Sequence, residues 1–379
     1  MPEPTVQMNE QLYNQNKGLL ENLYEESNSQ ITTLAKMVTG LIIGTHVQLW
    51  AIAIWLHFDV LLLSQVKALD RFLSDSTVDI KKYFHPFVQA MHASLGYEVA
   101  YIILDCTKAG PKCRTLVAGL VYHQTVLPLV WKTYKGSKGH LKGEKQKELL
   151  QELAPCFANH HHVVVLGDAE FSNEPVISWL LVKEWDFVFR FQSRYLVQTE
   201  SAGQWLTMKE VYTNAALERG SIKHWEDATY TATHEIADLT LTVQWAEGED
   251  EPICLVSTLS IAEAPHLVYE MRYWIETLFG NQKSRGFQLA RTHLTNPDKI
   301  DRLFLALAIA TCMVLGLATH VVIIGETHSI DRSDRRDLSL FQLGYRYLLL
   351  LLSRNRLSEF KMYFRWDFKL PPPGFQPSI

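Results

Sequence analysis

The sequence predicts an α/β protein with an N-terminal helical domain, a sheet-based core that carries a β-rich insertion, and a helical C-terminal region. Three observations predict this class. Apolar residues recur at three- and four-residue intervals up to about residue 95, short β-branched runs then alternate with a helical pattern, and helical spacing returns after Ala264. The 379 residues, 47% of them apolar, suffice for two or three domains and a large core.

The changes of pattern divide the chain into five regions. They are the N-terminal helical domain 1–95, the first part of the core 96–194, the β-rich insertion 195–252, the second part of the core 253–330, and the helical C-terminal region 331–379.

The N-terminal domain is expected to hold helices over Ile31–Val47, Leu49–Leu63 and Ser64–Leu73. Residues 1–15 and the proline-rich end after Leu370 have the composition of disordered tails. The domain contains five Lys and one Arg against four Asp and five Glu, so it is acidic.

The core and the insertion show strand patterns. A helix is expected over Lys142–Leu153, and a turn over 247–250. Strands are expected over Val99–Leu104, Thr115–Tyr122, Val126–Tyr134, Val163–Leu166, Asp186–Phe191, Thr229–Thr233, Leu239–Trp245 and Ile253–Thr258.

Charge and cysteine content narrow the function classes. The formal charge of −5 is unusual for a nucleic-acid binder, unless the basic residues cluster. They do so at 132–147, 283–302 and 332–356, although each cluster can equally be a solvated face. None of the five cysteines has CxxC spacing, and the N-terminus has no signal-peptide pattern, so we expect a reducing, cytoplasmic environment.

One apolar segment is long enough to span a membrane. Leu303–Gly325 carries no formal charge. Polar side chains interrupt the run, and its small residues Ala306, Ala308 and Ala310 would allow close helix packing. We therefore favour a buried core segment and expect no membrane partner.

Two aspartates directly follow apolar, strand-like runs. Asp105 comes after Ile102–Leu104, and Asp168 comes after Val164–Gly167. Carboxylates at strand ends can project into one crevice. An aspartate in this position is also often a turn residue or a helix cap, so the pattern alone does not establish a site.

A later stretch is more specific, because it has the spacing Y-x2-R-x3-E-x6-K. On a helix that advances ~100° per residue, its Tyr269, Arg272, Glu276 and Lys283 fall within a ~60° arc. The core side of the same helix is expected to hold Met271, Trp274, Ile275 and Leu278. A solvated face with an Arg272–Glu276 pair is the alternative, but it does not explain the tyrosine and the lysine.

These residue types suit phosphodiester chemistry. Three carboxylates can hold two Mg²⁺ ions, with Mn²⁺ as a substitute, because hard cations prefer oxygen ligands. Two such ions can activate an attacking hydroxyl and stabilise the leaving oxygen. Arg272 and Lys283 can bind phosphates, and Tyr269 can hydrogen-bond a phosphate or stack on a base. The nearby Arg285 is a further candidate for DNA binding.

At these residues the chain resembles the DDE transposases of bacterial insertion sequences, in the branch marked by a YREK signature. The signature is complete, and the resemblance extends to the segments Ile103–Thr107, Gly167–Phe171 and Leu69–Leu73. It implies a ribonuclease H-like catalytic core, catalytic and metal-binding roles for Asp105, Asp168 and Glu276, and DNA binding by residues 1–95.

The resemblance also implies an activity and partners. These are magnesium-dependent cleavage at transposon ends, strand transfer into double-stranded target DNA, and a homodimer that bridges the ends. The route can pass through a DNA hairpin, with a flipped base stacked on an insertion tryptophan, for which the candidates are Trp205, Trp225 and Trp245. Ala169, where relatives often have a basic residue, and the acidic N-terminal domain put local DNA contacts in question.

Other residues near these motifs have simpler interpretations. We expect Glu170 and Glu174 to be solvated or to cap a helix, His160–His162 to lie in a surface loop, and Cys106 not to be a nucleophile. Two other functions remain open, a domesticated, non-catalytic DNA-binding protein and a structure-selective nuclease on the same core.

Overall fold

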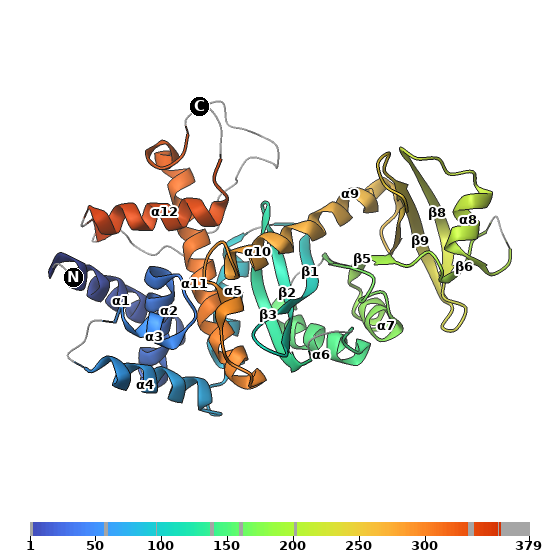
Figure 1. Cartoon of the computed structure of the whole chain (residues 1–379). Helices are drawn as coiled ribbons and strands as arrows, with labels where there is room; N and C mark the ends of the chain where they lie inside the picture. The colour runs from blue at the N-terminus through green and yellow to red at the C-terminus, as the bar shows by residue number, and fades with distance from the viewer. Residues whose placement is uncertain are drawn as a thin grey trace.

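The structure is a computed structural model that describes residues 3–56, 60–95, 97–136, 140–158, 162–200, 203–332, 337–354 and 356–357. It is an α/β protein built on one ten-stranded sheet with the strand order β3-β2-β1-β4-β5-β10-β9-β8-β6-β7. Figure 1 shows the N-terminal helices at one end of the molecule and strands β8 and β9 at the other.

The N-terminal helices form a packed layer beside the sheet. Asn28 caps the second helix by accepting a hydrogen bond from the Ile31 N–H at 2.9 Å. The helices are α1 (Glu3–Tyr24), α2 (Ser29–Gly44), α3 (Leu49–Ala53), α4 (Leu62–Ser74) and α5 (Ile80–Leu95).

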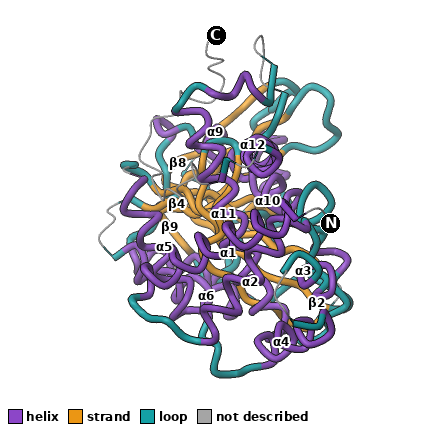
Figure 2. Tube along the Cα trace, turned by 90° about the vertical axis from the view of Figure 1, so that its left-hand side faces the viewer, coloured by secondary structure: helices purple, strands orange, loops and turns teal. Residues whose placement is uncertain are grey.

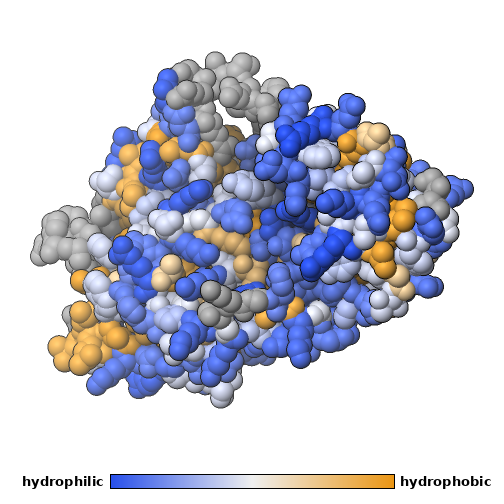
Figure 3. Space-filling view, turned by 45° about the vertical axis from the view of Figure 1, so that its right-hand side comes forward, coloured by the Kyte–Doolittle hydropathy of each residue, from blue (hydrophilic) through white to orange (hydrophobic). Residues whose placement is uncertain are grey.

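Two expectations for this region are wrong. Residues 3–15 belong to α1 rather than to a disordered tail, because Leu12 and Leu20 are buried and Asn16 donates to the Thr39 hydroxyl at 2.9 Å. The expected helix Leu49–Leu63 ends at Ala53, and a new helix begins at Leu62. Figure 3 shows an apolar surface patch where α4 begins, and its exposed side chains include Leu61 and Leu63.

The first half of the sheet contains the strands expected of the core. A meander of antiparallel strands, β3-β2-β1, is extended by β4 and β5, which run parallel to β1. The strands are β1 (Ala100–Lys108), β2 (Cys113–Tyr122), β3 (Thr125–Lys135), β4 (Val163–Gly167) and β5 (Asp186–Phe191).

The insertion continues the same sheet. Strand β10 (Ile253–Ser257) pairs with β5 on one side and with β9 on the other. The expected strand Leu239–Trp245 lies within the longer β9. The expected strand Thr229–Thr233 is largely wrong, because β8 ends at Tyr230 and residues 231–233 lie in the turn region that follows it. The insertion holds β6 (Leu196–Gln198), β7 (Leu206–Thr207), α8 (Met208–Asn214), β8 (Ser221–Tyr230) and β9 (Ile236–Trp245).

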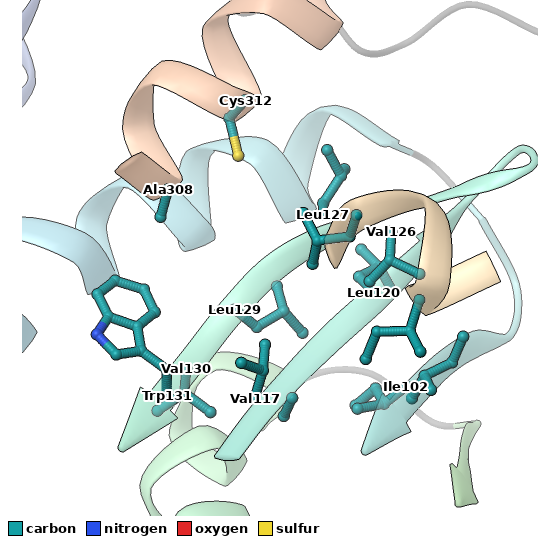
Figure 4. Packing of buried hydrophobic residues seen from close by; sticks show 14 of the residues in the cluster. Ile102, Val117, Leu120, Val126, Leu127, Leu129, Val130, Trp131, Ala308 and Cys312 are labelled. Carbon is teal, nitrogen blue, oxygen red and sulfur yellow. The ribbon is translucent and has the colours of Figure 1, made fainter. Parts of the chain in front are cut away.

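Helices cover the sheet, and α11 (Pro297–Ile323) is the central one. Figure 4 shows Ala308 and Cys312 of α11 packed beside Trp131 and Leu129 of β3, and Figure 2 shows helices lying over the strands. The remaining helices are α6 (Gly143–Leu153), α7 (Glu174–Lys183), α9 (Pro265–Glu270), α10 (Ile275–Gln282), α12 (Leu340–Ser353) and the 3₁₀ turns Ala154–Phe157, Ile261–Glu263, Met271–Trp274, Leu289–Arg291 and Glu326–Ser329.

The long apolar helix α11 has the length and composition of a membrane span, but it lies inside the protein. Its most apolar 18-residue window is 83% buried against the rest of the chain. It packs on α2, α4, α5, α12 and β3. Each fully buried Leu or Ile side chain contributes about 1.5–3 kcal/mol to folding, so this helix is a major source of core stability. The structure thus supports the core-helix interpretation.

Candidate active site

The first two carboxylates of the predicted site meet where β4 ends beside β1. Strand β1 was expected to end at Asp105, but it continues to Lys108. The pairing between β1 and β4 ends at Leu104 and Gly167, so β1 has no β4 neighbour beyond Leu104. Asp168 follows β4 directly. The aspartates therefore border a notch in the sheet, even though Asp105 lies within a strand.

One guanidinium nitrogen bridges the two aspartates. Arg272 Nη2 lies 2.9 Å from Asp105 Oδ2 and 3.7 Å from Asp168 Oδ2. Asp105 is only 9% exposed, and its Oδ1 accepts the Cys106 N–H at 2.6 Å. Burial raises the pKa of Asp105 to about 6, a shift that Arg272 opposes and that the charges of Asp168 and Glu276 reinforce. The site therefore concentrates negative charge around one arginine.

The third carboxylate approaches from a segment that is not a regular α-helix. The predicted helix around Arg272 is α9, a 3₁₀ turn over Met271–Trp274, and then α10. A 3₁₀ turn advances ~120° per residue instead of ~100°, so the residues after Trp274 are rotated away from the ideal positions. Ile275 and Leu278 are fully buried, as expected, and Glu276 is exposed.

Glu276 lies within electrostatic range of the aspartates but is not in contact with them. Its charge raises the pKa of Asp105, and its side chain makes no hydrogen bond or ion pair with the described residues. Among those residues, no group of three or more His, Cys, Asp or Glu side chains is arranged to hold a metal ion. The three acids converge on one region without forming a preassembled metal site.

The other signature residues surround this group. Burial raises the pKa of Tyr269 to about 12, with Arg272 and Arg190 as opposing charges, so its hydroxyl stays protonated. Burial also lowers the pKa of Lys283, which Glu276 and Asp105 partly offset. The exposed Arg190 of β5 could not be identified from the sequence pattern, because its proximity to Tyr269 depends on the sheet.

Arg285, the fourth candidate for DNA binding, lies just beyond this group. Its side chain is exposed, and its backbone N–H donates a hydrogen bond to the Gly280 carbonyl at 2.9 Å. A Cβ atom on Gly280 would lie 3.3 Å from the Arg285 side chain. The glycine thus leaves room for the arginine against the end of α10.

The turn after Asp168 is held from α6. Asp168 Oδ1 accepts the Glu170 N–H at 3.0 Å, and the Glu170 carbonyl accepts from Gln146 at 3.2 Å and from Asn173 at 2.9 Å. Gln146 is fully buried and also accepts from Asn173 at 2.7 Å. A buried amide on one helix therefore fixes the loop that presents Asp168.

The same turn carries an acid whose expected role is wrong. The Glu170 side chain is only 8% exposed instead of solvated. Its Oε2 lies 2.9 Å from His140 Nδ1 and 3.8 Å from Arg114 Nη2, and Arg114 donates to the Cys106 sulfur at 3.2 Å. Glu174 is half-buried and is the first residue of α7, but the residue that caps this helix is Asn173, which accepts the Val176 N–H.

These groups line a cavity that opens beside the aspartates. Its volume is about 280 Å³, and its walls are formed by Asp105, Cys106, Arg114, His140, Asp168 and Glu170. The sequence did not predict Arg114 or His140, because they come from β2 and from the loop before α6. Their approach to Asp168 depends on the strand order. The cysteine is not a nucleophile candidate, since burial raises the pKa of its thiol.

Several other predicted surface residues have internal partners. Lys132 lies 3.2 Å from Asp301, Lys299 lies 2.8 Å from Asp70, and Lys145 lies 4.3 Å from the centre of the Tyr134 ring. The basic clusters are therefore partly structural. The positions 138, 160, 161, 335 and 336 lie outside the described residues.

The three insertion tryptophans are all half-buried. Trp245 donates its indole N–H to the Glu249 carbonyl at 3.0 Å and packs on Tyr212. Trp225 lies at an irregularity in the pairing of β8 with β9, with Lys223 5.9 Å from its ring centre. Trp205 precedes β7. The contacts anchor Trp245 in the sheet more firmly than they anchor Trp225.

Comparisons with known proteins give one family match. The family described as "Transposase DDE domain" matches residues 91–313. No curated protein matches the chain. A cryo-EM structure of a piggyBac transposase synaptic complex with hairpin DNA is similar with a TM-score of 0.44 and 13% identity, over 98% of this chain and 84% of that one.

Proposed function

The chain belongs to the family of proteins with a transposase DDE domain, and from this premise we propose that it cuts DNA at the ends of a mobile element and joins the freed ends to target DNA. The proposed catalytic residues are Asp105, Asp168 and Glu276. One observation carries the proposal: Arg272 lies within 4 Å of both aspartates, and the charge of Glu276, one turn later, acts on Asp105.

We propose further that the core is ribonuclease H-like. The support is its topology, in which the antiparallel strands β3-β2-β1 are followed by the parallel strands β4 and β5. This arrangement brings the acid within β1 and the acid after β4 to the same edge. The YREK-type segment then supplies the third acid from a helix that packs on β1 and β3.

The acids fit a divalent cation. A cationic nitrogen of the protein itself already lies between oxygens of Asp105 and Asp168, and carboxylate oxygens are the ligands that Mg²⁺ and Mn²⁺ prefer. We propose that these two residues and Glu276 hold two ions. When bound, the ions would activate the attacking hydroxyl and stabilise the leaving 3′ oxygen. Glu276 must approach the aspartates for this, together with the DNA.

The remaining signature residues would bind the DNA backbone. Arg272 has a planar fork of donors that suits a phosphate as well as a carboxylate, so an arriving phosphate can take over its N–H groups and release the aspartates. The protonated Tyr269 can donate to a phosphate oxygen. Lys283 and Arg285 extend the cationic side of the site. Each residue thus binds or orients the substrate while the carboxylates face the reacting phosphate.

The proposed partners are double-stranded transposon ends and target DNA, bound by a homodimer. A hairpin route would require a flipped base to stack on an insertion tryptophan. We favour Trp225 over Trp245, because the indole N–H of Trp245 is already hydrogen-bonded within the sheet. Trp205 remains the third candidate.

The test uses the DNA that flanks the gene, labelled and incubated with the full chain and MgCl₂. We expect cleavage at the element ends and joining to a target plasmid. Asp105→Asn, Asp168→Asn and Glu276→Gln should each abolish cleavage and preserve DNA binding. Glu270→Gln removes an exposed acid from the same segment and is the matched control, with full cleavage expected.

The outcomes distinguish the alternatives. Cleavage that persists in one of the three variants removes that residue from the site. Cleavage without joining would indicate a structure-selective nuclease. DNA binding without any metal-dependent cleavage would indicate a domesticated DNA-binding protein, and inverted repeats beside the gene would argue against that outcome.

A further inference from the structure

The cavity beside the aspartates contains a cationic wall that the proposed catalytic roles do not use. Arg114 lies on β2, and its side chain is 15% exposed. The guanidinium has five N–H donors, but its contacts with Cys106 and Glu170 both involve Nη2. Its Nε and Nη1 have no hydrogen-bond partner among the described residues, and the side chain lines the cavity. Donors of a half-buried arginine are thus available to a ligand.

The second feature is the way this arginine is held. Glu170 is 8% exposed, and one of its oxygens, Oε1, is buried with no hydrogen-bond partner in the described chain. Its other oxygen lies between Arg114 and His140. An acid in this position fixes the direction of a flexible arginine before a ligand arrives, which reduces the entropy lost on binding.

The cavity is continuous with the proposed reaction site. Asp105 and Asp168 form one part of its wall, and Arg114, His140 and Glu170 form another. The cavity forms where the pairing of β4 with β1 ends at Leu104. Beyond that point β1 and β2 remain paired as far as Lys108 and Arg114, with no β4 residue beside them. A DNA strand has a phosphate every ~3.4 Å along the helix axis. A strand that presents one phosphate to the aspartates therefore has further phosphates close to this notch.

We propose that Arg114, oriented by Glu170 and assisted by His140, binds a phosphodiester group next to the one that reacts. This proposal rests on the proposed function and deepens it, because it names the part of the DNA that the notch takes. The volume of about 280 Å³ is slightly below the ~300 Å³ at which pockets for small organic ligands begin, which suits a phosphate with part of its sugar. Arg114 and His140 are phosphate-binding residues here, and Glu170 is a positioning residue.

A purely structural role for Arg114, as the counter-ion of a buried glutamate, is the alternative. The two roles differ in salt dependence, because a phosphate contact releases counterions from DNA and an internal ion pair does not. The probe is a fluorescent duplex of arbitrary sequence, since target DNA of any sequence must reach the same site. Binding by the full chain is measured over a fourfold range of salt, with CaCl₂ replacing MgCl₂ so that the DNA is not consumed.

Arg114→Ala should make the slope of log K against log salt shallower by ~0.9. Arg114→Lys should keep the slope, because the charge remains. Glu170→Gln keeps an acceptor for Arg114 and removes a negative charge, so its affinity should equal or exceed that of the wild type. Lys183→Ala removes an exposed cation from α7 and is the control, with no change expected.

Equal slopes for the wild type and Arg114→Ala would overturn the proposal. These results are independent of the test of function. A wild-type protein that cleaves DNA but shows no Arg114 effect retains the proposed function and loses the phosphate subsite. A protein that does not cleave, but in which Arg114→Ala flattens the slope, retains the subsite and loses the proposed function.

Discussion

Asp301→Asn should remove part of the pH dependence of folding stability. Asp301 lies on α11 and is 1% exposed. Its Oδ1 accepts the Thr133 N–H at 2.8 Å, and its Oδ2 lies 3.2 Å from Lys132 Nζ. Burial raises the pKa of this carboxyl from 3.8 to about 6, although Thr133 and Lys132 act in the opposite direction. Between about pH 3.8 and pH 6, the Asp301 carboxyl therefore holds a proton in the folded protein that it has already released in the unfolded chain.

The direction and the size of the pH effect on folding stability follow from the pKa values of Asp301 in the folded and the unfolded protein. A raised folded-state pKa gives stability that is fully present below pH 3.8 and is lost as the pH rises through about 6. A shift of about 2 units corresponds to ~3 kcal/mol in total at ~1.4 kcal/mol per unit. Integrated between pH 5 and pH 8, the loss is ~1.4 kcal/mol. Asparagine keeps an acceptor for the Thr133 N–H and does not titrate in this range.

The measurement is urea unfolding at pH 5 and pH 8, followed by tryptophan fluorescence. Trp131 donates its indole N–H to the backbone carbonyl of Asp301 at 3.1 Å, so its fluorescence reports on this part of the core. Relative to the wild type, Asp301→Asn should be ~1.4 kcal/mol more stable at pH 8 than at pH 5. Asp298→Asn, an exposed change on the same helix, is the control. An identical pH dependence in the wild type and Asp301→Asn would refute the reasoning.

Two further predictions concern packing and the loop at the site. Gly344→Ala would push a Cβ atom against the Val314 carbonyl where α12 crosses α11, and should cost roughly 1–3 kcal/mol in thermal unfolding. Gly18→Ala, in open space within α1, should stabilise by ~0.5–1 kcal/mol, and equal effects of the two changes would contradict this packing. Gln146→Leu removes the hydrogen bonds that hold the turn after Asp168, and should slow end cleavage ~10- to 100-fold with DNA affinity unchanged. Unchanged cleavage would show that the turn needs no support from α6.

Local sequence pattern was sufficient for the strands that position the site. The run Asp186–Phe191 was predicted with its observed bounds, and Val163–Leu166 differs from β4 by one residue. Both strands lie inside the sheet. The continuous apolar composition of β4 is a direct result of its burial, whereas β5 is apolar except at Asp186 and the exposed Arg190. Strand β1 extends beyond its prediction to Lys108, because pairing with β2 rather than apolar composition holds its last residues.

Contacts between distant segments could not be predicted in the same way. The 3₁₀ turn over Met271–Trp274 has no breaker residue such as Gly or Pro, so periodicity alone predicted a regular helix. The environment of Glu170 depends on Arg114, which is 56 positions earlier in the chain and two strands away in the sheet. A single sequence places acids at strand ends, but it does not show which cations the sheet brings to them.

The position of Arg272 explains why the acids converge without forming a metal site. A buried carboxylate without a counter-charge is strongly destabilising, and burial dominates the raised pKa of Asp105. Arg272 supplies the counter-charge and holds Asp105 and Asp168 together while Glu276 remains in solvent. An ion that replaced the guanidinium would leave Arg272 free to bind a phosphate. The arginine between the aspartates is therefore compatible with the proposed catalytic role for them, and in that proposal it would link the binding of the cation to the binding of the DNA.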